Sequence, residues 1–280
     1  EHITDEELAG EIWLEYGIAV KEHCSLEQAI LVLKKGITDC PTSKILQFTL
    51  NTQLYEQTCP SSVENGRVYL EKNAELYPWL KPAEVYHNRV HLLNCLFFSG
   101  DYDSARNEGE ELLLQTSTRG LRNEEGRVCN ILACLAIIRG EPDKARTFFD
   151  QGSRIFDNNN YISNFWPLLL NYGTLLTHEK DWSGAEAYLS RTYDILSEHY
   201  VQRIQTISFH EQSGLPRLLG GLLILRYNIR ALPKSALTET LINMDLRLAE
   251  LCGEYVPTAK IESALCGSNY NFGKWFLMGY

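Results

Sequence analysis

The stretch "SGDYDSARNEGE" (residues 99–110) decides how the rest of the chain is interpreted. Its carboxylates suggest a calcium loop, whereas its glycine and small residues suggest a turn between two helices. The same pattern recurs forty residues later as "RGEPDKARTFFD" and forty residues later again as "EKDWSGAEAYLS". The alignment places Ala105, Ala145 and Ala185 at one position. A repeat of about forty residues is therefore the main organising feature of the sequence.

Two further units lie upstream. The segment "CSLEQAILVLKKG" places Ala29 at the same position, and "SSVENGRVYLEKN" places Gly66 there, 37 and 39 residues before the next small residue. A small side chain fits where a second helix presses closely on the helix before it. Capping boxes beginning at Thr4, Ser25 and Ser61 mark helix starts. We therefore expect an all-α fold made of paired helices.

The calcium interpretation fails on spacing. Counted from Asp101, a calcium loop needs Asp or Asn, Gly and Glu where this chain has Ala105, Arg106 and Leu112. Asp101 is instead expected to cap a helix.

A zinc interpretation of "HNRVH" (residues 87–91) is also weak. Two histidines stand one helical turn apart with Cys95 a turn further, but Asn88 replaces the Glu of a metalloprotease motif, and no second Cys/His cluster is evident. We expect the histidines to line a groove and Cys95 to pack in the core. The sequence predicts no metal and no cofactor.

Composition narrows the class of protein. The chain has 280 residues, a net charge of −10 and 44% hydrophobic residues, which is typical of a folded chain and argues against direct nucleic-acid binding. No apolar run approaches the roughly 20 residues that span a bilayer.

Eight cysteines without a C-x-x-C pair favour a reducing, cytoplasmic setting. The absence of an initiator Met suggests that the chain is a fragment of a longer polypeptide. Its expected partners then include the other domains of that polypeptide. Phosphate-binding loops and nucleophile elbows are absent from the sequence, so we expect no enzyme.

The first unit resembles a tetratricopeptide repeat (TPR). Trp13, Gly17, Ala29 and Pro41 stand at the spacing of its W…G…A…P signature, and residues 100–105 match its G-x-Y-x-x-A turn. The long period resembles the solenoid regions of bacterial STAND ATPases and maltose-type transcription activators. The resemblance implies a right-handed αα-superhelix of about five to six helix pairs. We expect helical repeats over residues 1–200, and a degenerate pair with an aromatic C-terminal cap over residues 201–280.

The resemblance also implies a concave groove lined by the first helix of each pair. Asparagine recurs among its expected positions, and an amide can both donate to and accept from a peptide backbone. The expected groove residues are Asn51, Tyr55, His87, His91, Asn94, Arg127, Asn130, Asn171 and Thr174.

A basic segment follows residue 213. It contains Arg217, Arg226, Arg230 and Lys234 around the apolar run "LLGGLLIL". It is either a partner contact or a buried helix with charged ends.

These features predict a non-catalytic sensor or protein-interaction region of a larger regulatory or signal-transducing protein, which binds a protein or peptide in its groove. Two alternatives remain open. One is the small-molecule or peptide-pheromone effector domain of a transcription regulator. The other is a self-assembly scaffold that forms a homo-oligomer through the apolar run.

Overall fold

The computed structural model describes residues 5–59, 62–159, 162–204, 221–222, 225–226, 228–230 and 232–255. Within these ranges every regular element is an α-helix or a short 3-10 turn, which confirms the all-α prediction. The aromatic cap expected near the C-terminus lies outside the described residues, and the predicted boundary at residue 200 stays a prediction.

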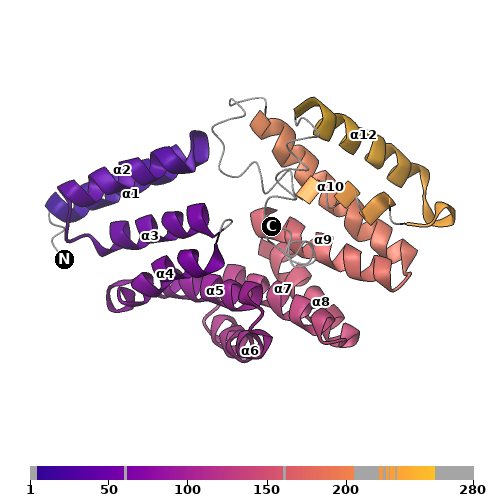
Figure 1. Cartoon of the computed structure of the whole chain (residues 1–280), viewed down its shortest axis with the longest axis horizontal. Coiled ribbons are helices and arrows are strands. Elements are labelled where there is room, and N and C mark those ends of the chain that lie inside the picture. The colour runs from indigo at the N-terminus through magenta and orange to yellow at the C-terminus, as the bar shows by residue number, and fades with distance from the viewer. Residues whose placement is uncertain are drawn as a thin grey trace. The chain divides into compact units, whose positions relative to one another are not determined.

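The described helices form five consecutive pairs followed by a later helix (Figure 1). The pairs are α1 (Asp5–His23) with α2 (Leu26–Asp39), α3 (Lys44–Thr58) with α4 (Val63–Ala74), α5 (Pro82–Ser99) with α6 (Tyr102–Thr118), α7 (Arg122–Ile138) with α8 (Pro142–Asn159), and α9 (Ile162–His178) with α10 (Trp182–Ile204). The later helix is α12 (Glu239–Tyr255), and the 3-10 turns are η1 (Tyr77–Trp79) and η2 (Lys234–Ala236).

The stretch of residues 99–110 is the turn between α5 and α6. Gly100 ends α5 with φ of 85°, a left-handed conformation that favours glycine. The Asp101 carboxylate then accepts a hydrogen bond from the backbone N–H of Ser104 at 3.2 Å. Gly140 repeats the left-handed conformation forty residues later with φ of 72°. Asp101 is therefore a helix cap, as the sequence predicts.

The capping boxes are confirmed in one case and corrected in another. Ser25 accepts from the backbone N–H of Gln28 at 3.1 Å, as expected. The N-cap of α4 is Ser62, which accepts from Asn65 N–H at 3.2 Å, and not the predicted Ser61. Two adjacent serines offer two possible caps, and the helix starts at the second. The first box begins outside the described residues.

The five aligned small residues are all buried, as the repeat requires: Ala29, Gly66, Ala105, Ala145 and Ala185. Gly17 and Gly173 stand twelve residues before Ala29 and Ala185, on the first helix of their pairs. A side chain at Gly17 would meet Leu33 Cδ2 at 2.7 Å, and one at Gly173 would meet Leu189 Cδ2 at 2.9 Å. In both pairs the side chain closest to the glycine is therefore the leucine one helical turn after the aligned alanine.

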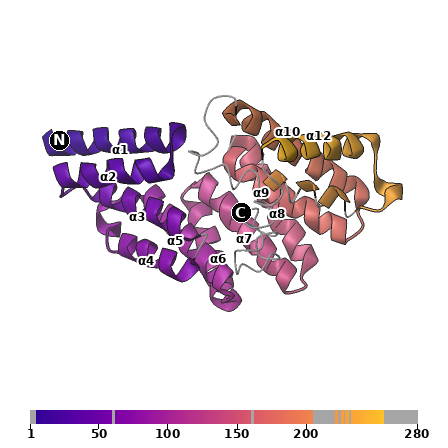
Figure 2. The same ribbon diagram turned by 45° about the horizontal axis from the view of Figure 1, so that its top comes forward.

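The chain divides into two compact units. One contains Glu1–Ala105 with Ile204–Ser213, and the other contains Arg106–Arg203 with Gly214–Tyr280. In the first unit α1 packs on α2 and α3, α3 packs on α4, and α4 packs on α5 (Figure 2). In the second unit α7 packs on α8 and α9, and α8 packs on α9.

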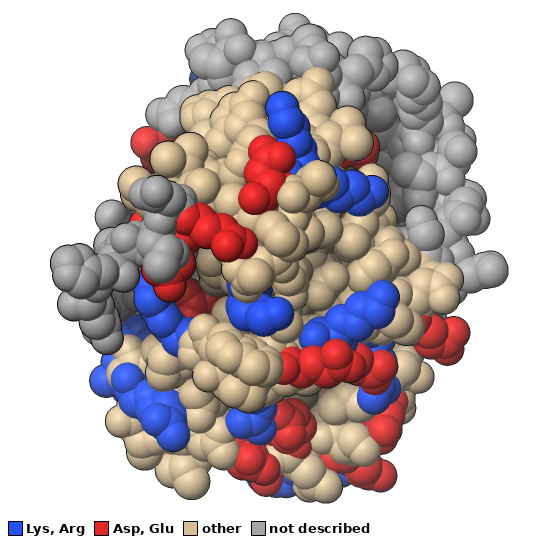
Figure 3. Space-filling model, turned by 90° about the vertical axis from the view of Figure 1, so that its left-hand side faces the viewer, with Lys and Arg blue, Asp and Glu red and all other residues tan. Residues whose placement is uncertain are grey.

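The face of the molecule drawn in Figure 3 shows little segregation of charge. On the face drawn in Figure 3, Lys and Arg side chains lie among Asp and Glu side chains. None of the described helices combines the length and the apolarity that crossing a bilayer requires.

Candidate interaction site

Most of the predicted groove residues lie in the interior. Six of the nine are no more than 8% exposed; they are Tyr55, His91, Asn94, Asn130, Asn171 and Thr174. The remaining three, Asn51, His87 and Arg127, are half-buried. Only these three present a sizeable part of their side chain to a ligand.

In the first unit the recurring asparagines hold helices together. Asn51 donates to Asn73 Oδ1 at 3.0 Å, and Asn73 donates to Asn88 Oδ1 at 3.2 Å. Asn88 in turn donates to the Leu70 carbonyl and to the Tyr77 hydroxyl, both at 2.9 Å. Asn73 and Asn88 are completely buried. This chain of amides joins α3, α4 and α5, and the sequence reasoning missed its two central members.

The histidine pair lies beside this network. The Nε2 atoms of His87 and His91 are 3.1 Å apart, and the His91 ring lies 4.9 Å from the Tyr55 ring. Cys95 packs with Tyr55 and Leu70 in a hydrophobic cluster, as expected for a core thiol. Burial raises its pKa to about 12. Among the residues that the structure describes, no three His, Cys, Asp or Glu side chains are grouped to hold a metal.

The second unit contains a similar set of polar contacts. Asn171 donates to Asn130 Oδ1 at 3.0 Å, which ties α9 to α7. Asn228 donates to the Thr174 hydroxyl at 3.0 Å, and that hydroxyl donates to the Leu170 carbonyl at 2.8 Å. These predicted groove residues are brought together, but as contacts between helices.

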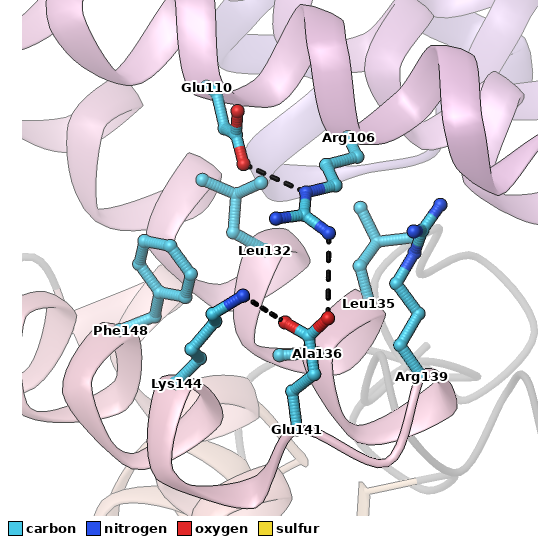
Figure 4. A pocket seen from close by; sticks show the side chains of 9 residues that line it. All are labelled: Arg106, Glu110, Leu132, Leu135, Ala136, Arg139, Glu141, Lys144 and Phe148. Atoms are coloured by element: carbon cyan, nitrogen blue, oxygen red, sulfur yellow. Dashed lines mark hydrogen bonds and ion pairs between the residues drawn. The ribbon is translucent and has the colours of Figure 1, made fainter.

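A pocket opens where α6, α7 and α8 meet, and we call this meeting point the first joint. Its volume is about 230 Å³. Figure 4 shows its lining residues, which combine an apolar floor with a charged rim. The floor consists of Leu132, Leu135, Ala136 and Phe148. The rim consists of Arg106, Glu110, Arg139, Glu141 and Lys144.

The charges of the rim are arranged by short contacts. Arg106 Nε lies 2.9 Å from Glu110, and its Nη1 lies 3.5 Å from Glu141. Lys144 Nζ lies 2.6 Å from Glu141. The hydrogen bond from Lys144, with the charges of Arg106 and Arg139, lowers the pKa of the Glu141 carboxyl. The rim thus carries three cations against two carboxylates.

The next joint, where α8, α9 and α10 meet, follows the same plan. We call it the second joint. Arg146 stands forty residues after Arg106 and binds Glu179, as Arg106 binds Glu141. In both joints the arginine directly after the aligned alanine forms an ion pair with a glutamate in the turn between the next two helices. The A-R dipeptide forty residues apart is a signal from which the sequence could have predicted this contact.

The basic segment after residue 213 is tied into the second unit where it is described. Arg226 and Arg230 both bind Asp245 of α12, with Nε–Oδ1 distances of 3.0 and 3.1 Å. Lys234 lies in η2, and Arg217 lies outside the described residues. A partner contact through these residues stays a prediction.

Comparison with known proteins supports the fold. No protein-family model matches the chain, and no curated protein matches its sequence. Among solved structures, BtubC (BKLC) from P. vanneervenii is 16% identical, with a TM-score of 0.50 over 92% of this chain and 94% of that one. PilF of Pseudomonas aeruginosa is 19% identical, with a TM-score of 0.51 over 89% and 94%.

A third similar structure is aspartyl phosphate phosphatase F from Bacillus subtilis. It is 11% identical, with a TM-score of 0.58 over 98% of this chain and 68% of that one. At these identities the likeness concerns the arrangement of the helices alone. The chain therefore has the fold of the TPR-like helical-repeat proteins.

Proposed function

We propose that this chain is a non-catalytic protein-interaction module that binds a segment of a partner protein. The observation that supports this function best is the pocket of the first joint. Its floor is apolar, its rim carries charges of both signs, and it is built on three packed helices. Such a pocket suits an anchoring side chain, because buried anchors in rigid pockets supply most of the binding energy of interfaces.

The size of the pocket favours a protein segment over a small effector. Pockets for small molecules usually measure about 300–1,000 Å³, whereas this one measures about 230 Å³. One side chain fills that space, and the rest of a peptide would lie along the rim. The charges on Lys144 and Arg139 would then favour an acidic residue beside the anchor.

The predicted groove is a second part of the proposal. Its half-buried members Asn51 and His87 in the first unit, and Arg127 in the second, are the residues through which it would act. In a larger regulatory protein, binding at the pocket or at these residues would be passed to attached domains.

Selection from a displayed library of random peptides tests the proposal. We expect enriched peptides to bind the purified chain saturably in fluorescence polarisation. Lys144→Glu should weaken their binding at least tenfold, because it makes the rim acidic and brings a carboxylate against Glu141. Lys81→Glu reverses another exposed lysine near a helix start and is the matched control.

A His87→Ala variant distinguishes the two sites. Peptides that lose affinity for this variant and keep it for Lys144→Glu would place binding in the groove. If no peptide is enriched over an unrelated helical protein, or if both variants bind every peptide as the unmodified chain does, the proposed function is wrong.

A further inference from the structure

The second joint shows what can fill the first. Each lining residue of the pocket has a counterpart forty residues later, so the two joints can be compared position by position. The acceptor Glu110 corresponds to Asp150, and the ring of Phe148 corresponds to the ring of Tyr188. Two lining residues differ in size between the joints: Leu132 corresponds to Tyr172 and Ala136 to Leu176. Beside Glu110, Gly109 corresponds to Phe149.

In the second joint a tyrosine occupies this space. The Tyr172 side chain is only 5% exposed. Its ring stacks on Phe149 with centroids 4.9 Å apart and lies 4.4 Å from the ring of Tyr188. Its hydroxyl donates to Asp150 Oδ1 at 3.0 Å. Burial and this hydrogen bond raise the pKa of Tyr172, so the phenol stays neutral and remains a donor.

The first joint keeps two of the groups around this site but lacks its occupant and the stacking ring, because Gly109 stands where the second joint has Phe149. Glu110 supplies a carboxylate and Phe148 supplies a ring, whereas Leu132 and Ala136 are both smaller than their counterparts. Figure 4 shows Leu132 between Phe148 and Leu135, with Glu110 joined to Arg106 by a dashed contact. The open volume corresponds to the space that the ring of Tyr172 and the larger side chain of Leu176 fill in the second joint.

We propose that the pocket of the first joint binds a tyrosine side chain from a partner segment. The ring lies against Phe148 above Leu132 and Ala136, and the hydroxyl donates to Glu110, as Tyr172 donates to Asp150. This inference names the ligand for the proposed peptide binding and rests on it. Glu110 is an acceptor for the neutral phenol, whereas the three cations of the rim, Arg106, Arg139 and Lys144, would attract a phosphate, so a phosphorylated probe separates these two modes of recognition.

Small probes test the chemistry of the pocket directly. The probes are N-acetyl-tyrosinamide, N-acetyl-phenylalaninamide and N-acetyl-O-phosphotyrosinamide, titrated into the full chain and followed by two-dimensional NMR. We expect the tyrosine probe to shift the resonances of the first joint saturably. The phenylalanine probe should bind at least tenfold more weakly, because a hydrogen bond to a charged acceptor is lost. If the phosphorylated probe bound more tightly than the tyrosine probe, the cations of the rim would be the recognising groups and the hydrogen bond to Glu110 would be overturned.

Two variants close the pocket from within. Leu132→Tyr reproduces the second joint and should abolish binding of the tyrosine probe. Ala136→Leu removes part of the same space with a smaller change. Leu114→Tyr adds a tyrosine at a position of α6 that is 67% exposed, and it should leave binding unchanged.

The outcomes separate this inference from the proposed function. If the tyrosine probe does not bind, or binds the unmodified chain and the Ala136→Leu and Leu132→Tyr variants equally, the tyrosine pocket is overturned. If the probe binds as expected while no library peptide does, the pocket chemistry stands and the peptide-binding function falls. Peptides that bind through Lys144 but lack any aromatic residue would overturn the tyrosine pocket alone.

Discussion

Asn73 holds three helices of the first unit, and its removal should be costly. Its amide group donates to Asn88 Oδ1 at 3.2 Å, to Thr52 Oγ1 at 3.1 Å and to the Phe48 carbonyl at 3.3 Å. Its own oxygen accepts from Asn51 at 3.0 Å. The amide has two hydrogens for these three acceptors, so Asn73→Ala loses about two donated bonds at about 1 kcal/mol each, and the buried Asn88 oxygen loses its donor at a further cost of about 1–3 kcal/mol. The bond from Asn51 is not counted, because that half-buried side chain can turn to water. We expect the free energy of unfolding to fall by about 3–5 kcal/mol.

Urea unfolding followed by circular dichroism measures this loss. A fall of 3 kcal/mol changes the unfolding equilibrium more than a hundredfold, because each ~1.4 kcal/mol is a factor of ten. Asn65→Ala, at an exposed position of the same helix, is the control and should change stability by no more than about 0.5 kcal/mol. A loss below about 1 kcal/mol for Asn73→Ala would refute the view that buried amides hold α3, α4 and α5 together.

Four further outcomes follow from other contacts of the structure. Gly126→Ala should cost about 1–3 kcal/mol in urea unfolding, because its new methyl would lie 2.5 Å from the fully buried Phe156 ring. Native protein should react with a thiol reagent faster at the half-buried Cys24 than at the buried Cys95 when sites are identified by mass spectrometry. Because burial raises the pKa of Cys95 from 9.0 to about 12, the unfolded chain loses that proton first, so the free energy of unfolding should fall as the pH rises from about 9 to 12. Asp245→Asn should cost about 1 kcal/mol, since it removes the shared partner of two partly exposed arginines.

The repeat could be predicted from the sequence because its cause is local and recurrent. A small residue at each close approach, a glycine ending one helix and a carboxylate opening the next all leave marks at fixed spacing. Ala105, Ala145 and Ala185 are each completely buried, and the Asp101 cap forms as expected. These features depend on neighbours along the chain and on one repeated contact.

The groove could not be placed in the same way. Counting positions along a helix identifies which side chains share a face, but it does not say whether the next helix covers that face. The sequence predicts that Asn130 and Asn171 meet a ligand, and in the structure these two buried side chains bind each other. An asparagine that binds a peptide and one that binds another helix have the same spacing in the sequence. The difference depends on the distance between helices, which the repeat alone does not determine.

Comparison between repeats supplies part of what a single repeat cannot. Where two joints have the same arrangement of side chains, a position that is large in one and small in the other indicates either a packing defect or a binding site. In the second joint the ring of Tyr172 fills the space between the helices and donates to Asp150. In the first joint the smaller Leu132 leaves the corresponding space open, and the carboxylate of Glu110 lies at its rim. An unfilled apolar space inside a protein is destabilising, whereas an open space with a charged rim is accessible to a partner. The first joint belongs to the second kind, because its rim holds five charged side chains and its floor is apolar.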